Sequence, residues 1–237
     1  KNSDLLLPWE IVSGLKTKIL GQQAYYFDSI DSTQNQALKM ADEPKNEGAI
    51  IIAEKQTGGR GRSGRKWISP KGGIWLSIIL HPKFDISITT LFPIASSLAL
   101  SYAIEKITKT SPSLKWPNDL TVNGKKLAGM LVDVSMQSNR IESLVLGVGI
   151  NFNVNVKEIG KELKNTSNYY GIASLTEQKD KVTAIELVQS FLLELEKIYE
   201  LLNTGQTKKI ISEWTKRSST IGKKVENDTV DGKIKGD

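Results

Sequence analysis

A glycine-rich stretch of eleven residues constrains the fold of this chain more than any other feature. It runs from Thr57 to Trp67 and holds four glycines and four cations but no acidic residue. Apolar runs at 49–53 and 74–80 flank it, so it is expected to be a loop that joins two strands. Glycines let backbone N–H groups approach a ligand, and Arg and Lys add charge-assisted donors. The loop is therefore predicted to bind an anion.

The excess positive charge of the chain is concentrated around this loop. Lys and Arg number 32 against 26 Asp and Glu, a net charge of +6. The window 55–71 alone contains six cations and no acid. A concentrated cluster of this kind predicts one anion site and argues against a broad nucleic-acid-binding face.

Composition excludes several classes of chemistry. The chain has 237 residues, no cysteine and one histidine, His81. Disulfides, thiolate metal sites, iron–sulfur clusters, a cysteine nucleophile and a histidine-rich metal site are excluded. His81 follows an apolar run and is expected to be a structural residue at a strand end. No apolar run approaches the roughly 18 residues of a membrane span, so we expect a cytoplasmic protein that does not bind membranes.

Apolar periodicity and turn signals predict the elements of the chain. We expect helices over residues 8–20, from the cap residues near 32 to 40, 90–107, 181–203 and 208–215. Strands are expected at 24–27, 49–53, 74–80, 114–133 and 141–152. From residue 220 the composition changes to short alternation of Gly, Asp, Lys and Val, which predicts a small β module that stops before it can build a core.

Two local patterns bear on a site. Asn123-Gly124 predicts a tight hairpin, which would bring Lys115, Asn118 and Asp119 near Lys126. Gly147 and Gly149 alternate along a strand and therefore lie on one face of it. The glycine pair is either a bulge or a shallow floor for a flat ligand.

Three familiar readings of the glycine-rich loop fail. Gly59-x-Gly61-x-x-Gly64 matches the dinucleotide fingerprint, but Pro70 and two glycines follow where that fingerprint needs a helix. A kinase-type loop lacks its His-Arg-Asp and Asp-Phe-Gly partners. A disordered Arg/Gly tract would not be this short between two strands. What remains is a site for nucleotide-dependent activation of a carboxylate, in which cations offset the repulsion between two anions. Its expected cations are Arg60, Arg62, Arg65, Lys115 and Lys126, with Asp119 near Mg²⁺ or a ribose.

Four motifs in this order resemble those of the biotin protein ligases. They are Gly59–Trp67, Lys115–Asp119, Lys126–Gly129 and Gly147–Asn151, joined by Asp31-Ser32-Thr33 and Gln56. The resemblance implies an α+β fold with a mixed central sheet packed by helices, similar to class II synthetases. It places the catalytic domain at residues 1–219 and the start of an SH3-like module at 220–237.

The resemblance also implies the chemistry. Biotin and MgATP would form biotinyl-5′-AMP, and a lysine of a biotin carboxyl carrier protein domain would then accept the biotin. The implied catalytic residues are Lys126, Arg60 and Asp119, with Lys126 as the principal one and Asp119 as the metal residue. The implied biotin-binding residues are Ser32, Thr33, Gln56, Gly59, Arg60, Arg62, Gly129, Gly147 and Gly149. The implied ATP-binding residues are Arg62, Arg65, Lys66, Trp67, Lys115, Asn118, Lys126 and Asn151.

Further expectations concern the partners of the protein, the mobility of the loop and the alternative functions. Only about 24 residues precede the first predicted strand, fewer than a winged helix needs, so no DNA binding is expected. The resemblance allows a homodimer through paired sheet edges. The loop is expected to be mobile when empty and to be ordered by the adenylate. The rival readings are a lipoate or octanoate ligase or transferase of the same fold, and a non-catalytic biotin sensor.

Overall fold

One mixed sheet of seven strands organises the protein, in the order β1-β2-β3-β7-β6-β5-β4. The structure is a computed structural model that describes residues 5–138, 140–164, 169–176, 182–222, 225–229 and 232–236. β1 and β2 are parallel and the other neighbours are antiparallel, which confirms the predicted mixed sheet. The strands are β1 (Ala24–Phe27), β2 (Ile50–Ala53), β3 (Ile74–Leu80), β4 (Ser113–Lys115), β5 (Asp119–Val122), β6 (Lys125–Gln137) and β7 (Arg140–Ile150).

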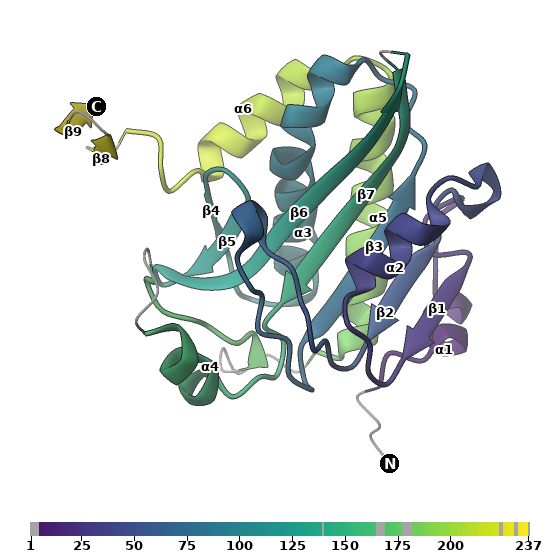
Figure 1. Cartoon of the computed structure of the whole chain (residues 1–237), viewed down its shortest axis with the longest axis horizontal. Coiled ribbons are helices and arrows are strands. Elements are labelled where there is room, and N and C mark those ends of the chain that lie inside the picture. Colours follow the sequence, from purple (N-terminus) through teal and green to yellow (C-terminus); the bar gives the residue numbers. More distant parts are fainter. Residues whose placement is uncertain are drawn as a thin grey trace.

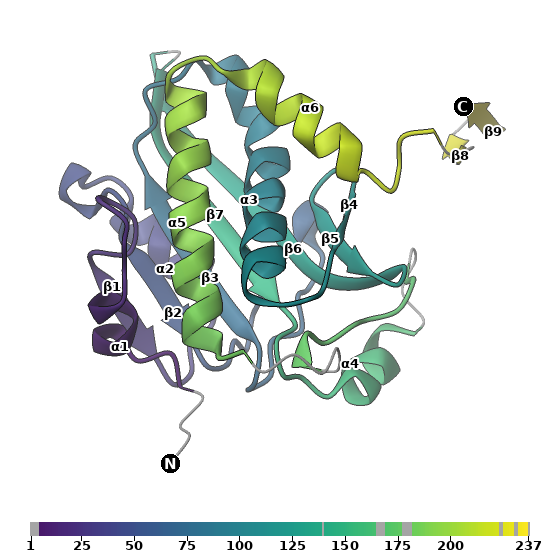
Figure 2. The same ribbon diagram turned by 180° about the vertical axis from the view of Figure 1, so that it is seen from behind.

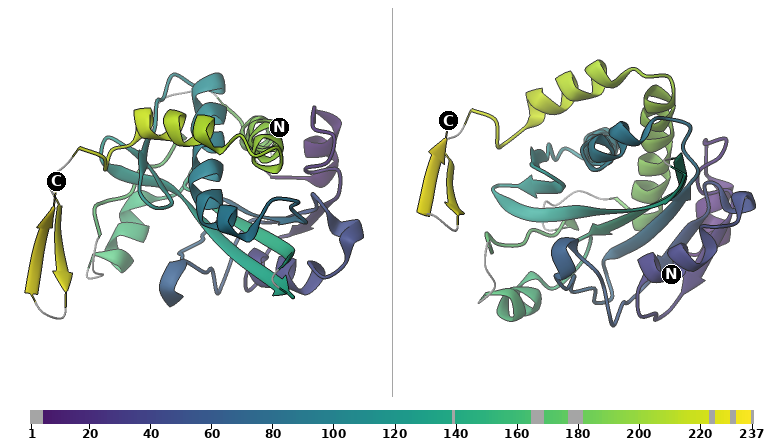
Figure 3. Two further views of the ribbon diagram at one scale, coloured as in Figure 1. Left: turned by 90° about the horizontal axis from the view of Figure 1, so that it is seen from above. Right: turned by 45° about the horizontal axis from the view of Figure 1, so that its top comes forward.

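The helices lie on both faces of this sheet. α3, α5 and α6 cover one face (Figure 2), whereas α2 and the glycine-rich loop lie on the other (Figures 1 and 3). The helices are α1 (Pro8–Ser13), α2 (Thr33–Met40), α3 (Phe92–Ile107), α4 (Val156–Leu163), α5 (Ala184–Asn203) and α6 (Thr207–Arg217). The short 3₁₀ helices are η1 (Pro44–Asn46), η2 (Arg62–Gly64) and η3 (Ile86–Leu91).

The central strands are apolar because both of their faces are covered. Ile50 and Ile52 of β2 pack into the main core beneath α3 and α5, and Ile51 packs under α2 on the opposite face. A strand buried on both faces needs a continuous apolar run, not an alternating one. The segment 86–107 is long and apolar enough to cross a membrane, with a mean hydropathy of 1.4. In this fold α3 lies beside α5 on one face of the sheet and contributes to the main core, which accounts for that composition.

Most expected elements are confirmed, with shifted ends. Asn123 and Gly124 have φ values of 51° and 74° and form the predicted hairpin turn between β5 and β6. α5 begins after Thr183, whose hydroxyl and backbone N–H form a capping box with Glu186. α4 was not predicted. The expected C-terminal β module is represented by a hairpin of β8 (Val225–Thr229) and β9 (Gly232–Gly236), which shares no strand pairing with the main sheet among the described residues.

The expected helix over residues 8–20 is wrong, because α1 ends at Ser13 and Gly14 follows it. The residues beyond are held by α5 instead of by helical hydrogen bonds. The Glu196 carboxylate accepts the backbone N–H groups of residues 18, 19 and 20 at 2.7, 2.8 and 3.0 Å. A tertiary contact thus supplies the acceptors that a longer helix would have provided.

Replacing Glu196 by alanine is expected to lower the free energy of unfolding by about 1–3 kcal/mol, because three backbone donors lose a charged acceptor. Urea unfolding followed by circular dichroism measures the change. Glu200→Ala is the matched control, since Glu200 lies one turn further along the same helix and is exposed. Equal stabilities of the two variants would contradict the anchoring role of Glu196.

Candidate active site

A cavity of about 680 Å³ opens on the face of the sheet that carries α2 and the glycine-rich loop. Its wall is built by the N-terminus of α2, the loop, the turn between β4 and β5, strands β6 and β7, and the segment 169–172. The structure thereby brings together residues that are far apart in the sequence. The predicted site residues that line the cavity are Ser32, Thr33, Gln56, Arg60, Arg62, Arg65, Lys66, Trp67, Lys115, Asn118, Asp119, Lys126, Gly129, Gly147, Gly149 and Asn151.

Gly59 is the one predicted site residue that lies outside the cavity wall. It is buried in the neck of the loop, where a Cβ atom would lie 2.3 Å from the Trp67 carbonyl oxygen and 2.6 Å from Ser69 Oγ. Trp67 also donates its backbone N–H to the Gly59 carbonyl at 2.9 Å. Gly59 is therefore needed for close approach of the two arms of the loop, and its assignment as a biotin-binding residue stays a prediction.

One end of the cavity is a neutral polar wall at the start of α2. Ser32 caps the helix, and Thr33 donates from its backbone N–H and its hydroxyl to Gln56 Oε1 at 2.8 and 3.1 Å. Gln56 Nε2 donates to Ser69 Oγ at 2.8 Å. Thr33 Oγ1 also lies 2.9 Å from Ser77 Oγ on β3. Side chains from three elements thus form one continuous network.

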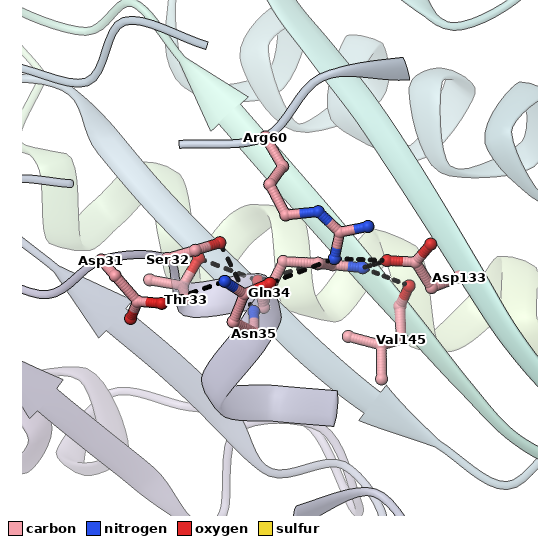
Figure 4. Close-up of polar contacts among 9 residues, drawn as sticks. Asp31, Ser32, Thr33, Gln34, Asn35, Arg60, Asp133 and Val145 are labelled. Carbon is pink, nitrogen blue, oxygen red and sulfur yellow. Dashed lines mark hydrogen bonds and ion pairs between the residues drawn. The ribbon is translucent and has the colours of Figure 1, made fainter. Parts of the chain in front are cut away.

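Gln34 fixes the polarity of this wall (Figure 4). Its Nε2 lies 3.1 Å from Asp133 Oδ2 and 3.1 Å from the Val145 carbonyl oxygen, and neither oxygen can donate. The amide nitrogen must therefore face them, so Oε1 accepts the Ser77 hydroxyl at 3.0 Å. The Thr33 hydrogen is used within the same network. A ligand group that meets these hydroxyl oxygens must consequently donate a hydrogen bond.

Gly147 and Gly149 form part of the floor, as one of the two readings of this pair predicted, but protein side chains lie against both. A Cβ at Gly147 would lie 2.5 Å from Gln34 Oε1. A Cβ at Gly149 would lie 2.6 Å from Cε2 and Nε1 of the Trp67 indole. The indole nitrogen is buried and has no hydrogen-bond partner among the described residues. The two glycines therefore admit Gln34 and Trp67 to the cavity wall.

The other end of the cavity is cationic. Lys126 Nζ lies 2.7 Å from Asp119 Oδ1, and the Tyr170 hydroxyl donates to Asp119 Oδ2 at 2.7 Å. Lys115 Nζ lies 3.3 Å from the centroid of the Tyr170 ring. Burial, reinforced by the Asp119 charge, raises the pKa of Tyr170 well above its usual range, so the phenol remains a donor. Asp119 is thus held from both sides.

The glycine-rich loop spans the cavity between two side-chain anchors. Arg60 Nη1 lies 3.2 Å from Asp133 Oδ2 and donates to Asn35 Oδ1 at 3.2 Å, on the α2 side. Arg62 Nη1 donates to Asn118 Oδ1 at 3.0 Å, on the β5 side. A 3₁₀ segment begins at Arg62, the second anchor, and ends at Gly64. The loop therefore lies over the pocket as a bridge.

Four residues that form or support the site were not identified from the sequence. Ser77 had a signal, because a serine within the buried apolar run 74–80 needs a polar partner. Gln34 and Asp133 meet only through the packing of α2 on the sheet, and Tyr170 lies in a segment without periodicity. His81 lies outside the cavity wall, with Nε2 at 2.8 Å from the Ala41 oxygen, as expected for a structural residue.

Asp119 is a poor metal ligand in the observed arrangement. Its two oxygens contact Lys126 and Tyr170, so a cation would have to displace one of them. Within the described residues, no group of three His, Asp or Glu could hold a metal ion. Its assignment as the metal residue stays a prediction.

The pocket has a neutral polar end and a cationic end on one face of a mixed sheet, an arrangement that suits an organic acid held beside a nucleotide. The family model of the biotin/lipoate A/B protein ligases matches residues 26–151. The chain belongs to the biotin/lipoate A/B protein ligase family.

Several characterised proteins are similar to this chain. The bifunctional ligase/repressor BirA of Bacillus spizizenii is 35% identical, over 96% of this chain and 69% of its own length. The biotin–[acetyl-CoA-carboxylase] ligase of Mycobacterium tuberculosis is 30% identical, over 76% of this chain and 64% of its own length. Among solved structures, the biotin protein ligase from Aquifex aeolicus in complex with biotin and ATP has a TM-score of 0.73 and 29% identity, covering 91% of this chain and 86% of that one.

Proposed function

We infer that this protein is an ATP-dependent biotin protein ligase. It joins biotin to ATP as biotinyl-5′-AMP, with release of pyrophosphate, and then transfers biotin to a protein lysine. The observation that carries this inference is the pairing of the two pocket ends, a hydroxyl network and a Lys126–Asp119 cation site, in one cavity. The relatives that are named biotin ligases support it.

The neutral end suits the ureido ring of biotin. That ring carries N–H donors, and the hydroxyl oxygens of Thr33 and Ser77 are available only as acceptors because their two hydrogens are used within the network that they form with each other, Gln34 and Gln56. A site built to accept hydrogen bonds rejects an analogue that has no donor, since its own polar groups would stay unpaired. Lipoate and octanoate have no N–H group, so the wall favours biotin over them.

The cationic end suits the reaction itself. A carboxylate that attacks the α-phosphate of ATP must approach another anion, and the attack displaces pyrophosphate. Lys126, which lies over the Trp67 ring with Nζ 4.9 Å from its centroid, can lie between the two reacting groups. Arg62, Arg65 and Lys115 line the same region and can offset the charge of the phosphates. Pre-placed cations in a partly enclosed cavity stabilise such developing charge without reorganising.

Mg²⁺ would accompany ATP on its phosphates. This ion binds through one or two carboxylates together with phosphate oxygens and water, so it does not need a cage of protein ligands. Asp119 is the carboxylate in the cavity wall that such an ion could reach, once Lys126 or Tyr170 releases it.

A biotin carboxyl carrier protein domain is the expected acceptor. Its lysine is an ammonium at neutral pH and must lose a proton before its nitrogen attacks the mixed anhydride. The adenylate phosphate and Asp119 are the groups at this end of the cavity that can take the proton. Attack forms the amide bond and releases AMP.

Biotin-dependent exchange of labelled pyrophosphate into ATP tests the function. Exchange is expected with biotin and not with lipoate or octanoate, because only biotin supplies donors to the polar wall. The variant Lys126→Ala, purified in the same way, controls for a contaminating ligase. Exchange with lipoate or octanoate would move the protein to that branch of the family, and binding of biotin without any exchange would favour a sensor.

A further inference from the structure

Asp133 of β6 stands directly behind the cavity wall. Arg60 and Gln34 line the cavity, and both contact a single oxygen of Asp133, Oδ2, at 3.2 and 3.1 Å (Figure 4). One contact comes from the glycine-rich loop and the other from α2. This carboxylate therefore joins the glycine-rich loop to α2, although it has no place in the motifs that define the family site.

The fixed side of this junction is rigid. Gln34 is 3% exposed and spans from β7 to β3, since its Nε2 also donates to the Val145 carbonyl and its Oε1 accepts from Ser77. Gly147 leaves the space that the amide occupies. Asp133 itself sits on the longest strand of the sheet, paired with Val145 on β7. Gln34 and the pairing of β6 with β7 hold the Asp133 carboxylate in place, so it does not follow the loop when the loop moves.

The contact between Asp133 and Arg60 restrains both arms of the glycine-rich loop. Arg60 and Lys66 pair across its neck, so a restraint on Arg60 also restrains the returning arm. On the far side of the loop, Arg62 donates to the uncharged side-chain amide of Asn118. The Arg60–Asp133 contact joins opposite charges whose side chains are only 39% and 29% exposed, which limits screening by water.

We propose that Asp133 is a positioning residue that holds the glycine-rich loop across the pocket and slows the escape of the activated acid. The proposal rests on the proposed function, because it concerns retention of biotinyl-5′-AMP. Asp133 acts through Arg60 and Gln34 and touches no substrate. Its removal should therefore change how long the adenylate stays bound far more than how fast it forms.

Asp133→Asn tests this role, since it keeps the shape and an oxygen acceptor but removes the charge. Preformed labelled biotinyl-5′-AMP on the full chain should dissociate about five- to tenfold faster than from the wild type, while pyrophosphate exchange stays within about twofold, as expected when an interaction gates release and not chemistry. Asp28→Asn is the matched control. Asp28 pairs with Lys71 at 2.7 Å just beyond the loop, with both side chains more than half exposed, so retention should not change.

Two further measurements keep the proposal falsifiable if Asp133→Asn folds poorly. Raising the salt concentration should speed release from the wild type, because it screens a partly exposed ion pair. Arg60→Gln should also speed release from an otherwise wild-type chain, because it removes the other charge of the same ion pair. Equal retention by Asp133→Asn and the wild type, with exchange intact in both, overturns this inference alone. Failure of the wild type to exchange pyrophosphate with biotin removes the proposed function and this inference with it.

Discussion

Replacing Lys126 by alanine is expected to lower the rate of biotin adenylation by about 100- to 1000-fold, the loss typical of removing one preorganised charge from a reacting centre. Biotin affinity should stay within about threefold of the wild type, since uniform binding of the substrate does not depend on this group. The expected split follows from the position of Lys126 at the cationic end of the cavity, where its ammonium contacts Asp119. The neutral wall at Thr33 and Ser77 is left intact.

Single-turnover formation of biotinyl-5′-AMP measures the adenylation rate, and calorimetric titration with biotin alone measures the affinity. Lys125→Ala is the matched control, because Lys125 is the preceding residue of β6, is exposed and does not line the cavity. Equal losses of rate and affinity in Lys126→Ala would refute its assignment as the residue between carboxylate and α-phosphate.

Adding one methyl group at Gly149 should damage the pocket nearly as much. A Cβ there would lie 2.6 Å from two atoms of the Trp67 indole, closer than any real contact. The indole cannot simply withdraw, because it packs edge-on against the buried Trp75 with ring centroids 6.5 Å apart. Overpacking of this kind costs about 1–3 kcal/mol, so Gly149→Ala should weaken biotin binding by about 5- to 150-fold if the strain falls on the liganded pocket.

A neighbouring glycine provides the control for this variant. A Cβ at Gly129 would lie 3.0 Å from the edge of the same indole, so Gly129→Ala should lose clearly less affinity than Gly149→Ala. Combining Gly149→Ala with Trp67→Phe should cost less than the sum of the two changes, because the smaller ring leaves room for the methyl group. Wild-type affinity in Gly149→Ala would mean that the indole moves freely and does not shape the site.

Local sequence patterns were sufficient for the strands and for most helices. The apolar runs of β2 and β3 and the Asn123-Gly124 turn form their elements without help from distant residues. The helix expected over 8–20 failed because Glu196, about 180 positions away, takes the backbone donors of residues 18–20. The periodicity of apolar residues predicts which face of a helix would be buried. It does not show that a side chain from another element accepts the backbone hydrogen bonds in place of the helix.

The sequence by itself determined the cations, the glycines and the order of the motifs, because these depend on residue type and on short spacing. Only the tertiary structure decided how they meet. The register of β5 on β6 and the approach of Tyr170 bring Asp119 against Lys126, and α2 must pack on β3 and β7 before Gln34 can join Ser77 to Asp133. Gly147 is needed for that packing, because a Cβ atom there would lie 2.5 Å from Gln34 Oε1. Contacts of this kind join residues that are far apart in the sequence. Local sequence patterns carry no information about the distances between such residues.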